Sequence, residues 1–287
     1  MDQLNRRSFV TLATAAAVTA GVGGGLLGAR PAAADPADLQ RWTARGSHQM
    51  SVTVQALATL YYPTDLSADD PRPVIIWGNG SGGIPYVYRG LFAHWVSYGY
   101  VVAAANTPNP ALGLLMRQTI DSLQRQNEAS GGRFAGTLQL DKIAASGHSQ
   151  GGQAAINAAI DPRVRTLIPI QPGPLADVEL VTSPMLLLTG SADPVVYPPL
   201  YVERWMRDRA HGPMVYGSLR GAAHFESVLT SDGGGFAAAT TAWLEATLRS
   251  DTRAASLFFG PDFGFERNTD WANVSRNEAA REYDVSG

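Results

Sequence analysis

Short apolar runs alternate with segments of helical periodicity through most of the chain. Apolar runs typical of strands buried on both faces of a sheet occur at residues 74–77, 100–105, 143–146, 165–170, 184–189 and 214–219. Apolar residues recur three or four positions apart, as in amphipathic helices, at residues 88–98, 114–128, 153–159, 200–209 and 236–249. This alternation predicts an α/β fold with a mostly parallel central sheet and helices on both faces.

The two ends of this pattern differ from its middle. Residues 51–62 alternate in polarity, which predicts one antiparallel edge strand. Residues 268–287 are polar and are expected to pack loosely. The stretch between residues 170 and 184 is too short for a helical cap, and no linker or repeat interrupts residues 35–287. We therefore expect a single domain over residues 35–287, with no cap domain.

Composition excludes several classes of function. The chain has 287 residues, of which 45% are apolar and 16% charged, so it can bury a sizeable core. It contains no cysteine, which rules out disulfides and thiolate metal ligands. The formal net charge of −3 provides no basic surface for nucleic acid. We expect a monomer that needs no metal or cofactor and binds no nucleic acid.

The N-terminal segment resembles a twin-arginine (Tat) signal peptide. Arg6 and Arg7 are followed by Ser8 and Phe9 and then by a weakly apolar run over residues 12–27. Three alanines at 32–34 provide the small residues that a signal peptidase requires. We expect residues 1–34 to be a cleaved Tat signal, no stable membrane span after cleavage, and a secreted or periplasmic protein. An uncleaved N-terminal anchor is the alternative.

Residues 147–151 read GHSQG, which fits the G-x-S-x-G pattern of a nucleophile elbow. A predicted strand precedes the pattern and a predicted helix follows it, as that turn requires. Ser149 would then present its hydroxyl at the N-terminus of a helix, where the helix dipole stabilises developing negative charge. The alternative is an ordinary glycine-rich turn between a strand and a helix.

A nucleophilic serine needs a histidine base and an acid that orients the base. Asp193 follows the predicted strand at 184–189, and His224 follows the strand at 214–219. The carboxyl ends of parallel strands meet at one edge of a sheet, so Ser149, Asp193 and His224 are expected to form a catalytic triad. Asp193 could instead cap a turn, and His224 could be an ordinary surface histidine.

Ester hydrolysis also requires donors for the oxyanion of the tetrahedral intermediate. One expected donor is the backbone N–H of Gln150, the residue after the nucleophile. The other is expected in the glycine-rich loop at residues 78–83, where we favour the N–H of Asn79. This loop lacks the lysine and serine or threonine of a phosphate-binding P-loop.

Five segments together resemble the bacterial cutinase-like polyester hydrolases of the α/β-hydrolase superfamily. These segments read VIIWGNGSGG, YGYVVAAANTP, SGHSQGG, LTGSADPVV and GAAHFE. The resemblance covers residues 73–261. It implies the α/β-hydrolase fold, the same triad, the same two oxyanion donors and a carboxylic ester as substrate, either a small molecule or a polymer.

The chain departs from those enzymes around the substrate. They carry an aromatic residue at the position of Asn79, a methionine at Gln150 and a tryptophan in the loop that here reads Ile170-Gln171-Pro172-Gly173. The resemblance implies that two aromatic rings clamp the polymer, and this chain lacks both. We expect substitute substrate contacts from a set of four aromatic residues: Tyr86, Tyr88, Trp95 and Tyr197.

Three alternatives stay open from the sequence. The same triad could serve a triglyceride lipase, or an amidase or peptidase. The chain could also be a binding module on this fold, without catalytic activity.

Overall fold

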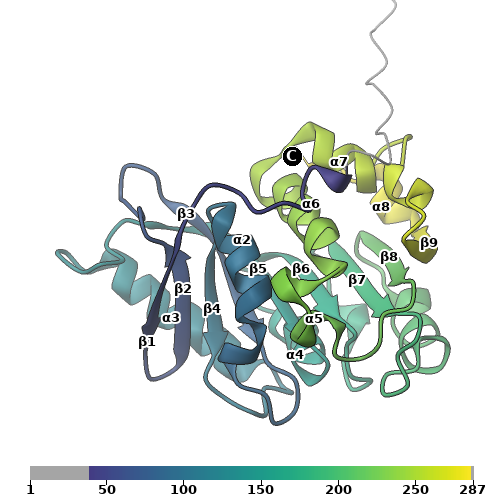
Figure 1. Ribbon diagram of the computed structural model, residues 1–287, viewed down its shortest axis with the longest axis horizontal. Helices are drawn as coiled ribbons and strands as arrows, with labels where there is room; N and C mark the ends of the chain where they lie inside the picture. Colours follow the sequence, from purple (N-terminus) through teal and green to yellow (C-terminus); the bar gives the residue numbers. More distant parts are fainter. Residues whose placement is uncertain (1–38, 286–287) are drawn as a thin grey trace, which may run out of the picture. The chain divides into compact units, whose positions relative to one another are not determined.

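Nine strands form one sheet in the computed structural model, which describes residues 39–285 (Figure 1). The strand order is β1-β2-β4-β3-β5-β6-β7-β8-β9. The strands span Met50–Val54 (β1), Ala58–Pro63 (β2), Arg72–Gly78 (β3), Val101–Ala105 (β4), Leu138–His148 (β5), Val164–Ile170 (β6), Met185–Gly190 (β7), Met214–Leu219 (β8) and Trp271–Arg276 (β9). Strands β4, β3, β5, β6, β7 and β8 pair in parallel, whereas the β1–β2, β2–β4 and β8–β9 pairs are antiparallel.

Helices follow most of the parallel strands. The α-helices span Arg89–Ser97 (α2), Leu114–Glu128 (α3), Gln150–Ala158 (α4), Glu226–Leu229 (α5), Phe236–Arg249 (α6), Thr252–Phe258 (α7) and Glu278–Glu282 (α8). Short 3-10 turns span Pro85–Tyr88 (η1), Val178–Leu180 (η2), Arg207–Arg209 (η4), Ser231–Gly233 (η5) and Gly264–Arg267 (η6), and a π-helical turn spans Pro199–Glu203 (η3).

Successive residues of a buried strand contribute to two different cores. In β3, Ile75 and Trp77 pack with residues of α2 and α6, whereas Val74 and Ile76 pack with residues of α3 and α4. This follows from the two-residue period of a strand, which sends neighbouring side chains to opposite faces. The predicted α/β fold, with helices on both faces of a mostly parallel sheet, is confirmed.

The prediction of one edge strand over residues 51–62 was wrong. The segment forms a hairpin, in which β1 is the edge and β2 pairs with both β1 and β4. At its turn the N–H of Gln55 donates to the carbonyl oxygen of Ala58 over 3.0 Å, and the side chain of Asn106 donates to the carbonyl oxygen of Gln55. The turn has no glycine or proline to mark it in the sequence, and part of its support comes from Asn106, far away along the chain.

The prediction of a loosely packed C-terminal tail was also wrong. Residues 271–276 form β9 on the edge of β8, and α8 follows. Trp271 is buried and its ring contacts those of Phe236 and Phe265. The partners of this segment are the edge of β8 and the core, which the polarity of the tail does not indicate.

The helix expected over residues 200–209 is replaced by the separate turns η3 and η4. Between β6 and β7 the chain forms only η2, so this segment adds no cap domain. In the part of the chain that the structure describes, no helix is long and apolar enough to cross a membrane. The predicted Tat signal, residues 1–34, lies outside the described residues.

Candidate active site

Ser149 lies at a sharp turn between β5 and α4. Its backbone φ of 56° lies in a region that residues other than glycine rarely adopt. A Cβ atom at Gly147 would lie 2.2 Å from the carbonyl oxygen of Gly151, and one at Gly151 would lie 1.9 Å from that of Gly78. Only glycine fits at these two positions, which is the physical reason for the GHSQG pattern.

Hydrogen bonds connect Ser149, His224 and Asp193 in a chain. Oγ of Ser149 lies 3.0 Å from Nε2 of His224, and Nδ1 of His224 lies 2.8 Å from Oδ2 of Asp193. Nδ1 carries the proton, because the carboxylate can only accept. Nε2 is then left to accept the proton of the serine hydroxyl. Ser149 follows β5, whereas Asp193 and His224 follow β7 and β8, so all three lie at the carboxyl edge of the sheet.

Asp193 is buried, yet its environment favours the ionised form. Burial by itself raises the pKa of a carboxyl group. Here hydrogen bonds from His224 and from the backbone N–H groups of Val196 and Val195 outweigh burial and lower the pKa of Asp193. The carboxylate is therefore charged at neutral pH and can stabilise a positive charge on His224.

Gln171 donates a further hydrogen bond to Asp193, and the sequence did not predict this role. Its Nε2 donates to Oδ2 of Asp193 over 2.8 Å and to the carbonyl oxygen of Ala223 over 3.0 Å. Both partners are acceptors, so the amide NH₂ must face them. Gln171 follows β6 directly, at the carboxyl edge where Asp193 and His224 were sought. Its place directly after a parallel strand was the sequence signal that could have identified Gln171 as a site residue.

The two expected oxyanion residues lie on neighbouring elements. Gln150 is the first residue of α4, so its N–H has no acceptor within the helix. Asn79 follows β3, and its buried side chain donates to the carbonyl oxygens of Ala105 and Thr107 over 2.7 and 3.0 Å. The side chain thus anchors the loop, which leaves only the backbone N–H of Asn79 for the expected role.

A family model described as PET hydrolase-like matches residues 32–275 of this chain. The chain belongs to the PET hydrolase-like family. This membership makes it a carboxylic ester hydrolase, as the resemblance implied. None of the curated proteins compared with the chain matches it.

The chain has no aromatic residue in either segment where the resemblance to polyester hydrolases implies a clamp ring: Asn79 stands in one, and the other reads Ile170-Gln171-Pro172-Gly173. Asn79 and Gln171 have 0% exposed surface, and each is committed to hydrogen bonds within the protein. Neither of these two side chains is accessible to a substrate. Rings that contact a substrate would have to come from other residues.

Of the four aromatic residues expected to contact substrate, two are buried and two are exposed. The expectation for Tyr88 and Trp95 was wrong, since their exposed fractions are 2% and 0%. Both rings pack against Trp77, because helical periodicity turns this side of the segment toward the sheet. Tyr86 and Tyr197 are 58% and 55% exposed and stay candidates for substrate contact.

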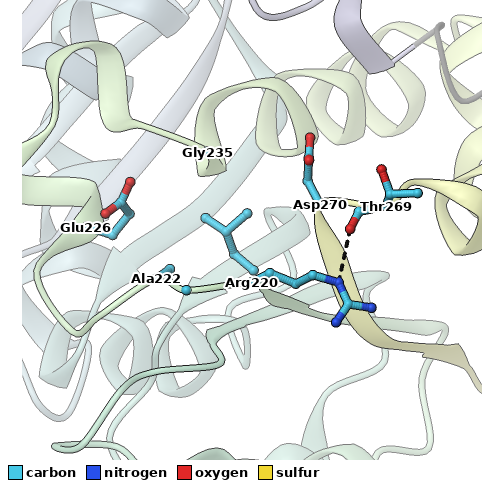
Figure 2. Close-up of a pocket in the computed structure, with 8 residues that line it drawn as sticks. Arg220, Ala222, Glu226, Gly235, Thr269 and Asp270 are labelled. Atoms are coloured by element: carbon cyan, nitrogen blue, oxygen red, sulfur yellow. Dashed lines mark hydrogen bonds between the residues drawn. The ribbon is translucent and has the colours of Figure 1, made fainter.

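Among residues 39–285 no three histidine or acidic side chains gather closely enough to hold a metal ion. Figure 2 shows a hollow beside the segment that carries His224, lined in part by Arg220, Glu226 and Asp270. In this hollow Nε of Arg220 donates to the carbonyl oxygen of Thr269 over 3.0 Å, which ties the end of β8 to the chain before β9. No triad residue lines the hollow, so the candidate active site is defined by the triad hydrogen bonds.

Proposed function

We propose that this protein is a secreted serine carboxylester hydrolase that acts through Ser149, His224 and Asp193 and forms an acyl-enzyme. The observation that carries the proposal is the unbroken hydrogen-bond chain from Oγ of Ser149 through the imidazole of His224 to Oδ2 of Asp193. Family membership supports ester hydrolysis as the reaction.

In the proposed mechanism His224 takes the proton of Ser149 as the hydroxyl oxygen attacks the ester carbonyl carbon. Asp193, charged and hydrogen-bonded to Nδ1, stabilises the imidazolium that forms. The proton then passes to the leaving alcohol, and the acyl group stays on Ser149. Water activated by His224 attacks the acyl-enzyme, releases the acid and restores the serine.

We assign the oxyanion to the backbone N–H groups of Asn79 and Gln150. The position of Gln150 at the N-terminus of α4 supports this assignment, because the helix dipole there favours negative charge. Removing one such donor costs about 3 kcal/mol of transition-state stabilisation in comparable enzymes.

The proposed substrates are polyesters or other bulky esters. The short segment between β6 and β7 supports this, because it adds no cap over the carboxyl edge of the sheet. The twin arginines Arg6 and Arg7 support export through the Tat pathway to a secreted or periplasmic location.

The test is hydrolysis of p-nitrophenyl esters from acetate to palmitate by the wild type and by Ser149→Ala. We expect activity in the wild type and none in the variant, together with labelling of Ser149 by an organophosphate. Ser227→Ala is the matched control, because Ser227 is a buried serine whose hydroxyl has no hydrogen-bond partner within residues 39–285.

Each other outcome has a clear meaning. A preference for long chains with activation at an interface would point to a lipase, and faster cleavage of matched amides to an amidase. No activity on any ester, with Ser149 inert to the organophosphate, would contradict the proposal and leave a binding module.

A further inference from the structure

His148, the residue before the nucleophile, lies between two parts of the site that are distant in sequence. Its side chain is 1% exposed. Nε2 lies 2.6 Å from the carbonyl oxygen of His224, and Nδ1 lies 3.1 Å from Oη of Tyr88. The same hydroxyl accepts a hydrogen bond from the N–H of Gly80 over 2.9 Å. We call these contacts, from Gly80 through Tyr88 and His148 to His224, the Tyr88–His148 bridge.

The two backbone groups at its ends set the direction of every hydrogen bond in this bridge. The N–H of Gly80 can only donate, so Oη of Tyr88 accepts there and gives its own proton to Nδ1 of His148. The carbonyl oxygen of His224 can only accept, so the single imidazole proton of His148 must be on Nε2. One tautomer and one hydroxyl orientation satisfy all four groups.

The bridge stays uncharged over a wide range of pH. Burial, followed by repulsion from His224, lowers the pKa of His148 to about 4. Burial raises the pKa of Tyr88 to about 12. No titration between these values reverses a hydrogen bond of the bridge, so its geometry is constant where an ester hydrolase works.

The packing leaves little freedom at either end. A Cβ atom on Gly80 would lie 3.0 Å from Oη of Tyr88 and 3.1 Å from Nδ1 of His148, so only glycine approaches this closely without displacing them. At the other end the imidazole rings of His148 and His224 lie 4.7 Å apart between centroids. Gly80 is the neighbour of Asn79, and His224 is the base of the triad.

We propose that Tyr88 and His148 are positioning residues, which hold the glycine-rich loop at residues 78–83, with its assigned oxyanion donor Asn79, and His224 at the spacing that the transition state requires. The proposal rests on the proposed function, since it concerns the same site. It predicts that loss of the bridge lowers kcat and leaves KM nearly unchanged, because a ground-state ester does not need the oxyanion donors.

The first test is Tyr88→Phe, which removes only the hydroxyl group. After titration of active sites with an organophosphate, we expect kcat per site to fall about tenfold, since a buried hydrogen bond is worth roughly that factor. Inhibition by phenylboronic acid, which mimics the tetrahedral intermediate, should weaken by a similar factor. Tyr100→Phe is the control, because it removes another buried hydroxyl, one that donates to Glu245.

Two substitutions of His148 separate the two hydrogen bonds of its ring. His148→Asn places its side-chain oxygen near the former Nδ1 and can keep the bond to Tyr88, but it loses the bond to His224. His148→Gln can keep a donor for the carbonyl oxygen of His224, but it loses the hydrogen bond to Tyr88. His148→Gln should therefore behave like Tyr88→Phe, and the double variant should lose no more than either single variant. The control is His94→Gln, since His94 is also buried and Nε2 of its ring pairs with the carbonyl oxygen of Trp42.

The outcomes are distinguishable. Per-site kcat and boronate affinity within twofold of the wild type, or independent losses in the double variant, would overturn the positioning role. If Tyr88→Phe does not fold, His148→Gln removes the same bond from the other side and decides the matter. A wild type that hydrolyses no ester and leaves Ser149 unlabelled would refute the proposed function, and the positioning role with it.

Discussion

Gln171 donates a hydrogen bond to Oδ2 of Asp193. The same oxygen accepts the hydrogen bond from Nδ1 of His224. The same amide group also donates to the carbonyl oxygen of Ala223, the residue before His224. Gln171 thus connects the proposed acid of the triad to the segment that carries the proposed base. Its backbone holds a φ of 47°, a conformation that costs a residue with a side chain of the order of 1 kcal/mol.

We predict that Gln171→Gly lowers kcat about tenfold with little change in KM, because two hydrogen bonds that orient the triad are lost. Stability should fall less than this loss suggests, since glycine adopts a positive φ without strain. Steady-state kinetics on a p-nitrophenyl ester and urea unfolding measure the two effects.

Ser250→Gly is the matched control for this prediction. Ser250 has a φ of 54° and is exposed at the end of α6, so its replacement reports strain relief together with the loss of one exposed hydrogen bond, from Oγ to the carbonyl oxygen of Val285. An unchanged kcat in Gln171→Gly would show that the amide of Gln171 does not orient the triad.

We predict that the free energy of unfolding falls as the pH drops from about 6.5, the ordinary histidine pKa, to about 4. Burial lowers the pKa of both His148 and His94 in the folded state. The unfolded chain therefore takes up protons in this window that the folded chain excludes, and acid favours unfolding. His148 alone accounts for up to about 3 kcal/mol.

Urea unfolding at a series of pH values tests this prediction. The slope against pH should decrease in His148→Gln and, separately, in His94→Gln, whatever the stability of each variant at pH 7. Asp193 acts at lower pH, because hydrogen bonds depress its pKa and the stability it contributes is lost only as it is protonated. A wild-type curve that is flat between pH 6.5 and 4 would contradict the prediction.

We predict that Tyr86→Ala and Tyr197→Ala slow the hydrolysis of a polyester film but not of p-nitrophenyl acetate. Tyr86 lies in η1 and Tyr197 follows Asp193, and both rings are more than half exposed. Each lost aromatic contact with the polymer should cost about fivefold, or roughly 1 kcal/mol. Release of soluble acid from the film gives the rate.

Ile160→Ala is the control for surface apolarity in this experiment. Ile160 is also exposed, but it follows α4 and so lies at the opposite edge of the sheet from the triad. Equal losses in all three variants would mean that the two tyrosines are not specific substrate contacts.

The sequence by itself determined the parts of this protein whose signals are local. Continuous apolar runs predict buried strands, because only a strand covered on both faces tolerates them, and α3 and α6 begin and end where helical periodicity does. The GHSQG turn needs its glycines for steric reasons. Asp193 and His224 follow strands whose carboxyl ends must meet in a parallel sheet.

The tertiary structure decided what depends on partners far apart in the chain. The hairpin β1–β2 is stabilised by Asn106, and strand β9 by the edge of β8 and the ring of Phe236, none of which lies nearby in the sequence. The chemistry of Tyr88 and Trp95 suggested substrate contact, but both rings pack against Trp77 of β3 instead. The hydrogen bonds of Gln171 and His148 also join segments far apart in the sequence, so only folding shows that these two side chains contact Asp193 and His224.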